Sequence, residues 1–174
     1  MLFRSAINGR LFVQGQRRTT ALDAYNGCVL WSLEIPGLER FNMPRDCGNW
    51  CADADRLYVA IRDRCWRIDA ASGEIEATMK APAGNVPGWS WDWGYIARDG
   101  GLLFGSSVKQ GTPHTNFFGG AGAGWYDSPI GPATYKICSD ALFAMEPTTG
   151  KLVWSYADGV ILNPTITVAD EIGR

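Results

Sequence analysis

Three stretches of this chain repeat at a nearly constant interval, and the repeat constrains the fold more than any other feature. Leu11 and Leu57 stand 46 positions apart, and Leu57 and Leu102 stand 45 apart. Each stretch joins a short apolar run to a later turn that ends in glycine. A fixed period of this length is typical of architectures that repeat one supersecondary unit. We therefore expect the same unit three times along the chain.

The turn glycines locate a single insertion. Gly27 and Gly73 are 46 positions apart, whereas Gly73 and Gly150 are 77 apart, which exceeds the period by 31. The excess falls between the second and third strands of the third unit, at Val108–Asp140. One period with one insertion accounts for the whole chain.

Each unit has the pattern of short strands. In the second unit, Leu57, Val59 and Ile61 alternate with Tyr58 and Ala60, the period of two expected of a strand with two distinct faces. We predict four strands in this unit, at Asn49–Ala52, Arg56–Ile61, Arg64–Asp69 and Glu74–Met79.

The last turn of each unit has the form Asp-x-x-x-Gly. It begins at Asp23 and at Asp69, and Glu146 takes the acidic position in the third unit. An aspartate carboxylate at such a position accepts backbone N–H bonds two residues further on. The closing glycine permits a positive φ. These turns predict a hairpin at the same place in each unit.

Four antiparallel strands that recur about every 46 residues indicate an all-β fold of the β-propeller type. The alternatives are an up-and-down barrel or a sandwich of four-stranded sheets, neither of which requires similar units at constant spacing. We assign the blades from the sequence as follows: 1–46 the first, 47–92 the second, 93–160 the third with its insertion at 108–140, and 161–174 the first strand of a truncated fourth.

The length then predicts an incomplete ring. Without the insertion the chain is about three repeats long, whereas propellers close with about four to eight blades. Asn163–Asp170 has the pattern of a first strand and turn of another unit. We therefore expect an arc of about three blades from a larger ring, with sheet faces exposed where neighbouring blades are missing. The remaining blades of the parent propeller are its expected partners.

The spacing Ala-x-Asp-x-x-x-Gly-x-x-x-Trp, at Ala21 to Trp31 and with Glu for Asp at Ala144 to Trp154, resembles the tryptophan-docking repeat of quinoprotein-like propellers, the pyrroloquinoline-quinone-like repeat family. The second unit departs from the pattern, with Arg67 for Ala and Ala77 for Trp. The resemblance covers all three units and implies the fold of quinoprotein alcohol dehydrogenases. It also implies that Trp31 and Trp154 pack against a neighbouring blade as structural residues.

The resemblance implies two kinds of function. Quinone- and Ca²⁺-dependent dehydrogenases of this family are marked by a vicinal Cys-Cys pair, and no Cys-Cys dipeptide occurs here. Scaffold proteins of the BamB type share the repeat and bind no quinone. Pyrroloquinoline quinone is thus a cofactor by resemblance only, and no ligand is identified from the residues. The resemblance favours the periplasm or cell envelope as the compartment.

A ligand site is expected near the propeller axis, where the segments that lead into the innermost strands converge. Three such segments carry polar and aromatic residues that could line one pocket: Arg45, Asp46, Asn49, Trp91, Asp92 and Asn163. An indole plane would cover a flat ligand, and Arg45 would hold a carboxylate bidentately. The alternative is that Arg45 and Asp46 form a solvated pair and that the tryptophans fill the funnel.

Composition and motifs exclude several classes of chemistry. The 16 Lys and Arg residues against 18 Asp and Glu leave no positive excess for a basic nucleic-acid binder. The chain contains no run of about 18 apolar residues, so the sequence predicts no transmembrane helix. The chain has no Gly-x-Ser-x-Gly elbow and no Cys-x-x-Cys pair, and its one histidine, His114, supports no zinc site. We assign no catalytic residue and no metal ligand.

The insertion Val108–Asp140 contains the glycine-rich run Gly119–Gly124 and several aromatic residues. The run lacks a following helix pattern and a Gly-Lys-Ser/Thr signature, which argues against a phosphate-binding loop. Long aromatic loops on a scaffold serve as lids or bind partners. We therefore expect the aromatic residues of this insertion to pack either on a blade or on a protein partner.

These observations favour a non-catalytic propeller segment that acts as a scaffold or as a ligand- or protein-binding platform in a larger protein. Two alternatives stay open. The chain could be part of a quinone- and Ca²⁺-dependent dehydrogenase, or an accessory propeller beside an enzyme domain elsewhere in the parent chain.

Overall fold

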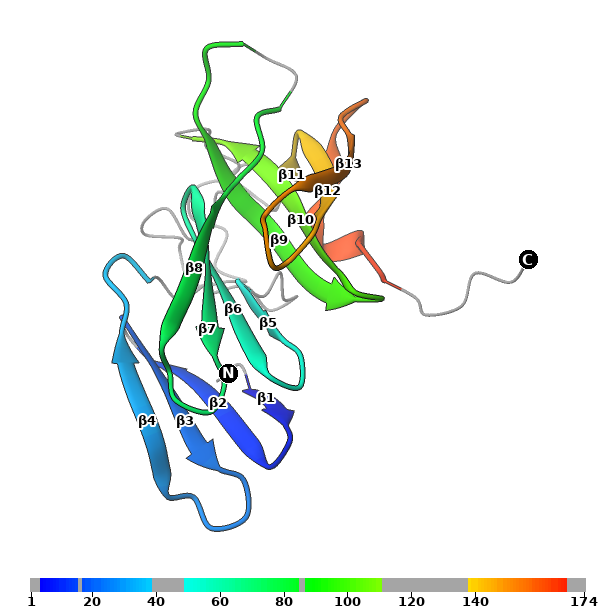
Figure 1. Cartoon of the computed structure of the whole chain (residues 1–174). Coiled ribbons are helices and arrows are strands. Elements are labelled where there is room, and N and C mark those ends of the chain that lie inside the picture. The colour runs from blue at the N-terminus through cyan, green and yellow to red at the C-terminus, as the bar shows by residue number, and fades with distance from the viewer. Residues whose placement is uncertain (1–3, 16, 39–48, 85–86, 111–137, 169–174) are drawn as a thin grey trace, which may run out of the picture.

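The computed structural model describes residues 4–15, 17–38, 49–84, 87–110 and 138–168, and these residues form an all-β structure (Figure 1). Three four-stranded antiparallel sheets follow one another in the order of the sequence. The first strands of the sheets are neighbours, because β1 contacts β5 and β5 contacts β9. The sheets thus radiate from their first strands, as propeller blades do.

Each sheet runs from a first, inner strand to a last, outer strand. The first sheet contains β1 (Arg4–Ile7), β2 (Arg10–Gly15), β3 (Arg18–Asp23) and β4 (Val29–Glu34). The second contains β5 (Trp50–Ala52), β6 (Arg56–Ile61), β7 (Arg64–Asp69) and β8 (Ile75–Lys80). The third contains β9 (Trp91–Asp99), β10 (Leu102–Lys109), β12 (Ala141–Met145) and β13 (Leu152–Tyr156). The four strands predicted for the second unit are confirmed to within one residue at each end.

Strand β6 shows how the sheets stack. Its Leu57, Val59 and Ile61 belong to an apolar core shared with the first sheet. Its Tyr58 and Ala60 belong to a second core shared with the third sheet. The predicted alternation is therefore confirmed, and both faces of the strand are buried because a blade covers each one.

The strand register corrects the spacing of the repeat. Leu11 lies opposite Leu22 and Leu57 lies opposite Ile68, one position after the alanine or arginine of the repeat. In the third sheet the residue in this place is Leu103, which lies opposite Met145. The alignment of Leu57 with Leu102 was therefore off by one. The structural period is therefore 46 residues, both from Leu11 to Leu57 and from Leu57 to Leu103. Of the neighbours Leu102 and Leu103, the buried Leu103 is the equivalent of Leu57.

The repeated turns form as predicted. The Asp23 carboxylate accepts the N–H of Tyr25 at 2.8 Å, and the Asp69 carboxylate accepts the N–H of Ala71 at 3.0 Å. The closing glycines have φ of 75°, 78° and 70° in the three sheets. A β-bulge follows the same position of the repeat in every sheet, at Ala21, Arg67 and Ala144.

The first junction between sheets depends on Trp31. Its ring is 9% exposed, and its Nε1 donates a hydrogen bond of 3.0 Å to the Ala70 carbonyl in the turn of the second sheet. Gly73 closes that turn beneath the indole, where a Cβ would approach ring atom Cδ2 to 2.7 Å. The predicted docking role of Trp31 is confirmed.

The second junction reaches the equivalent carbonyl with a different residue. Arg67 occupies the position of Ala21, and Ala77, its cross-strand partner, occupies the position of Trp31. The Arg67 guanidinium donates from Nη1 to the Pro147 carbonyl at 3.0 Å. Pro147, like Ala70, directly follows the turn acid. In the first sheet the large residue of the cross-strand pair is on the last strand, whereas in the second sheet it is on the third strand. A side-chain hydrogen bond to the next sheet is present in both cases.

The third sheet leaves its last strand uncovered. Trp154 packs on Phe104 of its own sheet with ring centroids 6.2 Å apart, as Trp31 packs on Phe12 at 5.8 Å. Trp154 is nevertheless 40% exposed, and every residue of β13 is exposed. The expected exposure of a sheet face at an end of the arc is thus observed.

The chain after β13 turns back onto the third sheet. Strand β14 (Ile161–Leu162) pairs with β11 (Cys138–Ser139), and a short 3-10 helix spans Asn163–Thr165. The strand expected in Asn163–Asp170 does not form within the part of that range that the structure describes, residues 163–168. Pro164 has no N–H to give to a sheet, and its fixed φ suits the first turn of a helix.

Candidate functional site

A groove of about 620 Å³ lies where the second and third sheets meet, at the end of the molecule where β9 begins. The lining comes from the β6–β7 turn, from the end of β8 and the residues after it, and from the residues that flank β9 and β10. We call this the inter-sheet groove, and its lining residues are Arg62, Asp63, Lys80, Ala81, Ala83, Trp89, Ser90, Trp91, Asp92 and Gln110.

Backbone hydrogen bonds hold the walls of the inter-sheet groove together. The N–H of Trp93 donates to the Arg62 carbonyl at 2.7 Å, which joins the third sheet to the second. The N–H of Ala81 donates to the Asp63 carbonyl at 2.8 Å, and the N–H of Gln110 donates to the Ser90 carbonyl at 3.0 Å. The groove is therefore framed by the sheets rather than by side chains alone.

Two indoles contribute the apolar surface of the groove. Trp91 is buried and lies against Gly84, where no room remains for a Cβ. Trp89 is 52% exposed. The Lys109 ammonium lies 5.7 Å from the ring centroid of Trp89 and 6.0 Å from that of Trp91, within cation–π range. Lys109 also pairs with Asp140 at 3.3 Å.

The polar side chains of the groove include a fixed hydrogen-bonded pair. Gln110 donates from Nε2 to the Asp92 carboxylate at 2.7 Å. The arrangement presents a carboxylate acceptor beside an amide, and Arg62 of the β6–β7 turn and Lys80 at the end of β8 line the same groove. Such a set can bind a small polar ligand by hydrogen bonds and by stacking on an indole.

The structure places two of the six predicted site residues together. Trp91 and Asp92 line the inter-sheet groove. Asn49 is buried before β5, where its carbonyl accepts the N–H of Ala60 at 2.7 Å. Arg45 and Asp46 lie outside the described residues. The expected partner surface on the insertion lies mostly outside them as well, since the structure describes only its ends.

Asn163 lies in a different polar cluster. Its Oδ1 accepts hydrogen bonds from the hydroxyls of Ser106 at 2.8 Å and Ser139 at 2.7 Å, and the Asn163 side chain is buried. The Ser106 hydroxyl also accepts the N–H of Tyr95. Gly94 lies against all three side chains and leaves no space for a Cβ. These contacts fix the segment after β14 to the third sheet.

Sequence reasoning missed several residues of the groove. Trp89 stands in the same aromatic segment as Trp91 and carried a visible signal. Arg62 lies between two strands that the sequence predicted, but only the stacking of the sheets brings it to β9. Lys80 and Gln110 carried no signal, because Lys80 ends an ordinary strand and Gln110 directly follows one.

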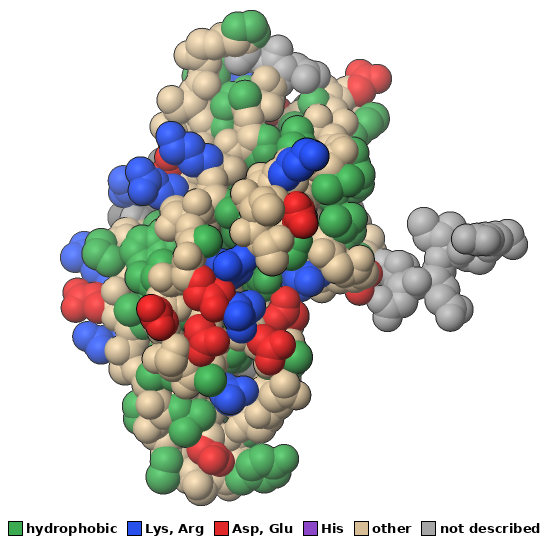
Figure 2. Space-filling model, viewed as in Figure 1, with side chains coloured by type: hydrophobic (Ala, Val, Ile, Leu, Met, Phe, Trp, Pro, Cys, Tyr) green, Lys and Arg blue, Asp and Glu red, His purple; other side chains and the backbone are tan. Residues whose placement is uncertain are grey.

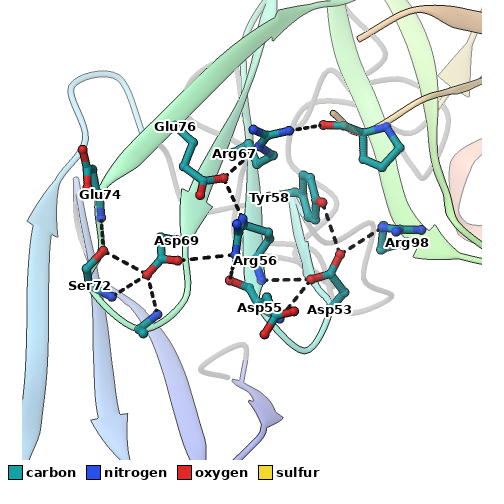
Figure 3. Close-up of polar contacts among 12 residues, drawn as sticks. Asp53, Asp55, Arg56, Tyr58, Arg67, Asp69, Ser72, Glu74, Glu76 and Arg98 are labelled. Carbon is teal, nitrogen blue, oxygen red and sulfur yellow. Dashed lines mark hydrogen bonds and ion pairs between the residues drawn. The ribbon is translucent and has the colours of Figure 1, made fainter. Parts of the chain in front are cut away.

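A second group of charged side chains ties the sheets together at another place. Figure 2 shows acidic and basic side chains gathered in the middle of one face, and Figure 3 shows their contacts. Arg98 of the third sheet donates to Asp53 of the second at 3.1 Å, and the Tyr58 hydroxyl donates to the same carboxylate at 3.2 Å. Arg56 and Arg67 share Glu76, at 2.6 and 3.0 Å.

Burial and these partners shift several pKa values. Loss of solvent, with the nearby Asp53 carboxylate, raises the pKa of Tyr58 to about 12. Hydrogen bonds from the Ser72 N–H and hydroxyl hold the pKa of Asp69 below its usual range. Burial raises the pKa of the Cys51 and Cys65 thiols, so neither is an activated nucleophile. The charged cluster joins the second sheet to the third, and we call it the inter-sheet clamp.

The described residues do not offer the cluster of carboxylates that a Ca²⁺ site requires. Among them, no group of three or more His, Cys, Asp or Glu side chains is placed to hold a metal ion. The carboxamide oxygen of Asn163 is engaged by two serine hydroxyls. Within the same ranges, no helix is long and apolar enough to cross a membrane.

Comparisons with known proteins rest on structure. No protein-family model and no curated protein matches the chain. The chain is similar to a europium-containing methanol dehydrogenase, with a TM-score of 0.55 and 18% identity, over 88% of this chain and 31% of that one. It is also similar to the quinohemoprotein alcohol dehydrogenase ADHIIG of Pseudomonas putida HK5, with a TM-score of 0.53 and 19% identity, over 88% of this chain and 20% of that one.

A third similar structure is BamB from Moraxella catarrhalis, with a TM-score of 0.50 and 15% identity, over 87% of this chain and 38% of that one. The chain thus spans between 20% and 38% of the length of these three proteins. At such identities the likeness concerns the fold. The three sheets form an arc of a β-propeller.

Proposed function

We propose that this chain is a non-catalytic segment of a quinoprotein-like propeller and acts as a scaffold and ligand-binding platform within a larger protein. The inter-sheet groove carries this proposal. It combines a volume in the range of small-molecule sites, about 300–1,000 Å³, with two indoles and a fixed Asp92–Gln110 pair. Trp91 and Asp92 of the predicted site are part of it.

The uncovered third sheet supports a place within a larger ring. Trp154 and Phe104 repeat the arrangement of Trp31 and Phe12, which at the first junction receives the turn of the next blade. We propose that a following blade covers Trp154 in the same way. The chain would then contribute three blades, with the remaining blades as its partners.

The test uses the full-length protein that contains this chain, supplied with pyrroloquinoline quinone and Ca²⁺. We expect no dye reduction with a primary alcohol or an aldose. Quinone-dependent dye reduction that a substitution in the inter-sheet groove abolishes would overturn the non-catalytic proposal and favour the dehydrogenase alternative. Dye reduction that no substitution in this chain affects would support an accessory propeller beside an enzyme domain.

A further inference from the structure

We propose that the inter-sheet groove binds a pyranose ring of a neutral saccharide, stacked on the indole of Trp89. The inference rests on the proposed ligand-binding role and adds a ligand class to it. Trp89 is 52% exposed although it lines a concave site. An indole in this position offers a flat apolar surface to a flat partner. The C–H face of a pyranose ring and an aromatic ring are two partners of that shape.

The remaining lining favours the sugar over an aromatic ligand. A ligand that is itself apolar is bound by a lining of mainly apolar and aromatic side chains. Six of the ten residues around this groove are instead polar or charged: Arg62, Asp63, Lys80, Ser90, Asp92 and Gln110. Sugar hydroxyls both donate and accept hydrogen bonds, which matches an array of mixed donors and acceptors.

The Asp92–Gln110 pair suits two adjacent hydroxyl groups. The carboxylate accepts one hydrogen bond from Gln110 and keeps further acceptor capacity. The Gln110 amide has a carbonyl oxygen and a second N–H in addition to the one it gives to Asp92. A carboxylate and an amide held 2.7 Å apart therefore present neighbouring acceptor and donor atoms to a polyol.

The charges of the groove favour a neutral saccharide. Arg62 and Lys80 are balanced by Asp63 and Asp92. The nearby Lys109 is balanced by Asp140, 3.3 Å away. A polyanionic chain needs an excess of cations, which this lining lacks. The backbone hydrogen bonds that join the two sheets hold these groups in place before a ligand arrives, which limits the entropic cost of binding.

The experiment is titration calorimetry of the full-length protein with three neutral probes, cellohexaose, maltohexaose and mannohexaose. We expect at least one probe to bind, and Trp89→Ala to weaken its binding at least tenfold. Tyr25→Ala is the matched control, because Tyr25 is 90% exposed in a turn of the first sheet, and it should leave the affinity unchanged. Failure of all three probes to bind, or equal binding by Trp89→Ala, overturns the proposal.

Two further arms test the chemistry. Asp92→Asn keeps the shape of the groove and should weaken the same probe several-fold, with an unchanged circular dichroism spectrum. Hexagalacturonate should bind more weakly than the neutral probe. Tighter binding of hexagalacturonate, or displacement of the neutral probe by pyrroloquinoline quinone at equal concentration, would replace the neutral sugar with an anionic ligand. These outcomes are independent of dye reduction, so the ligand class can fail while the non-catalytic role stands.

Discussion

The two junctions between sheets solve the same packing problem with different side chains. At the first, the indole of Trp31 on the outer strand donates to the Ala70 carbonyl. At the second, the guanidinium of Arg67 on the neighbouring strand donates to the equivalent carbonyl of Pro147. Both junctions use the same acceptor, the backbone carbonyl of the residue that follows the acidic residue of the turn. The donor can come from either member of the cross-strand pair, provided that the other member is small.

The largest expected effect is at the first junction. Trp31→Ala should reduce the free energy of unfolding of the full-length protein by about 3–5 kcal/mol, because it removes a buried ring and leaves a cavity between sheets. Chemical denaturation measures this loss. Trp31→Phe is the control that keeps most of the ring but removes the N–H, and it should cost less. A loss below about 1 kcal/mol for Trp31→Ala would show that the sheets do not depend on this contact.

The turn glycines should give a graded series. A Cβ on Gly73 would meet ring atom Cδ2 of Trp31 at 2.7 Å, whereas one on Gly150 would meet Cγ of the flexible Met79 at 3.1 Å, and one on Gly27 would meet nothing within 4 Å. All three have positive φ, which costs about 1–2 kcal/mol for alanine. We expect Gly73→Ala to destabilise most and Gly27→Ala least. Equal thermal shifts for the three would assign the whole effect to backbone strain.

The second junction should be weaker and should tolerate the pair found at the first. Arg67→Ala removes a charged hydrogen bond and the contact with Glu76, for about 1.5–3 kcal/mol. Ala77→Trp alone should also destabilise, because Arg67 fills the space. The double variant should recover part of both losses, a coupling that a double-mutant cycle measures. Simple additivity would show that the two junctions are not interchangeable.

The smallest effect concerns the clamp beside the second junction. Because the pKa of Tyr58 is raised to about 12 in the folded protein, its contribution is present below the ordinary value of about 10 and is lost as the pH rises from about 10 to about 12. Tyr58→Phe should cost about 1 kcal/mol at neutral pH, from the lost hydrogen bond to Asp53. It should also flatten the decline of the unfolding midpoint in that alkaline range, followed by denaturation at successive pH values. An unchanged slope would show that Tyr58 is not linked to folding.

The site was less predictable than the sheets. Trp91 and Asp92 were predicted because they lie in an aromatic segment that leads into an inner strand. Lys80 was not, because a lysine at the end of a strand is ordinary until another sheet lies against it. The groove forms from two sheets in contact, so its membership depends on which strand ends meet.

The sequence alone determined the all-β class, the repeating unit of about 46 residues, the repeated Asp-x-x-x-Gly turn and the docking of Trp31, because these depend on local hydrogen bonds and on a pattern that recurs. Only the tertiary structure decided that Leu103, not Leu102, continues the repeat, since strand register sets which leucine is buried. The tertiary structure also explains why Arg67 departs from the repeat pattern. Its guanidinium donates to the carbonyl of Pro147 in the next sheet, 3.0 Å away. The inter-sheet groove likewise exists only once two separate strand ends are packed against each other.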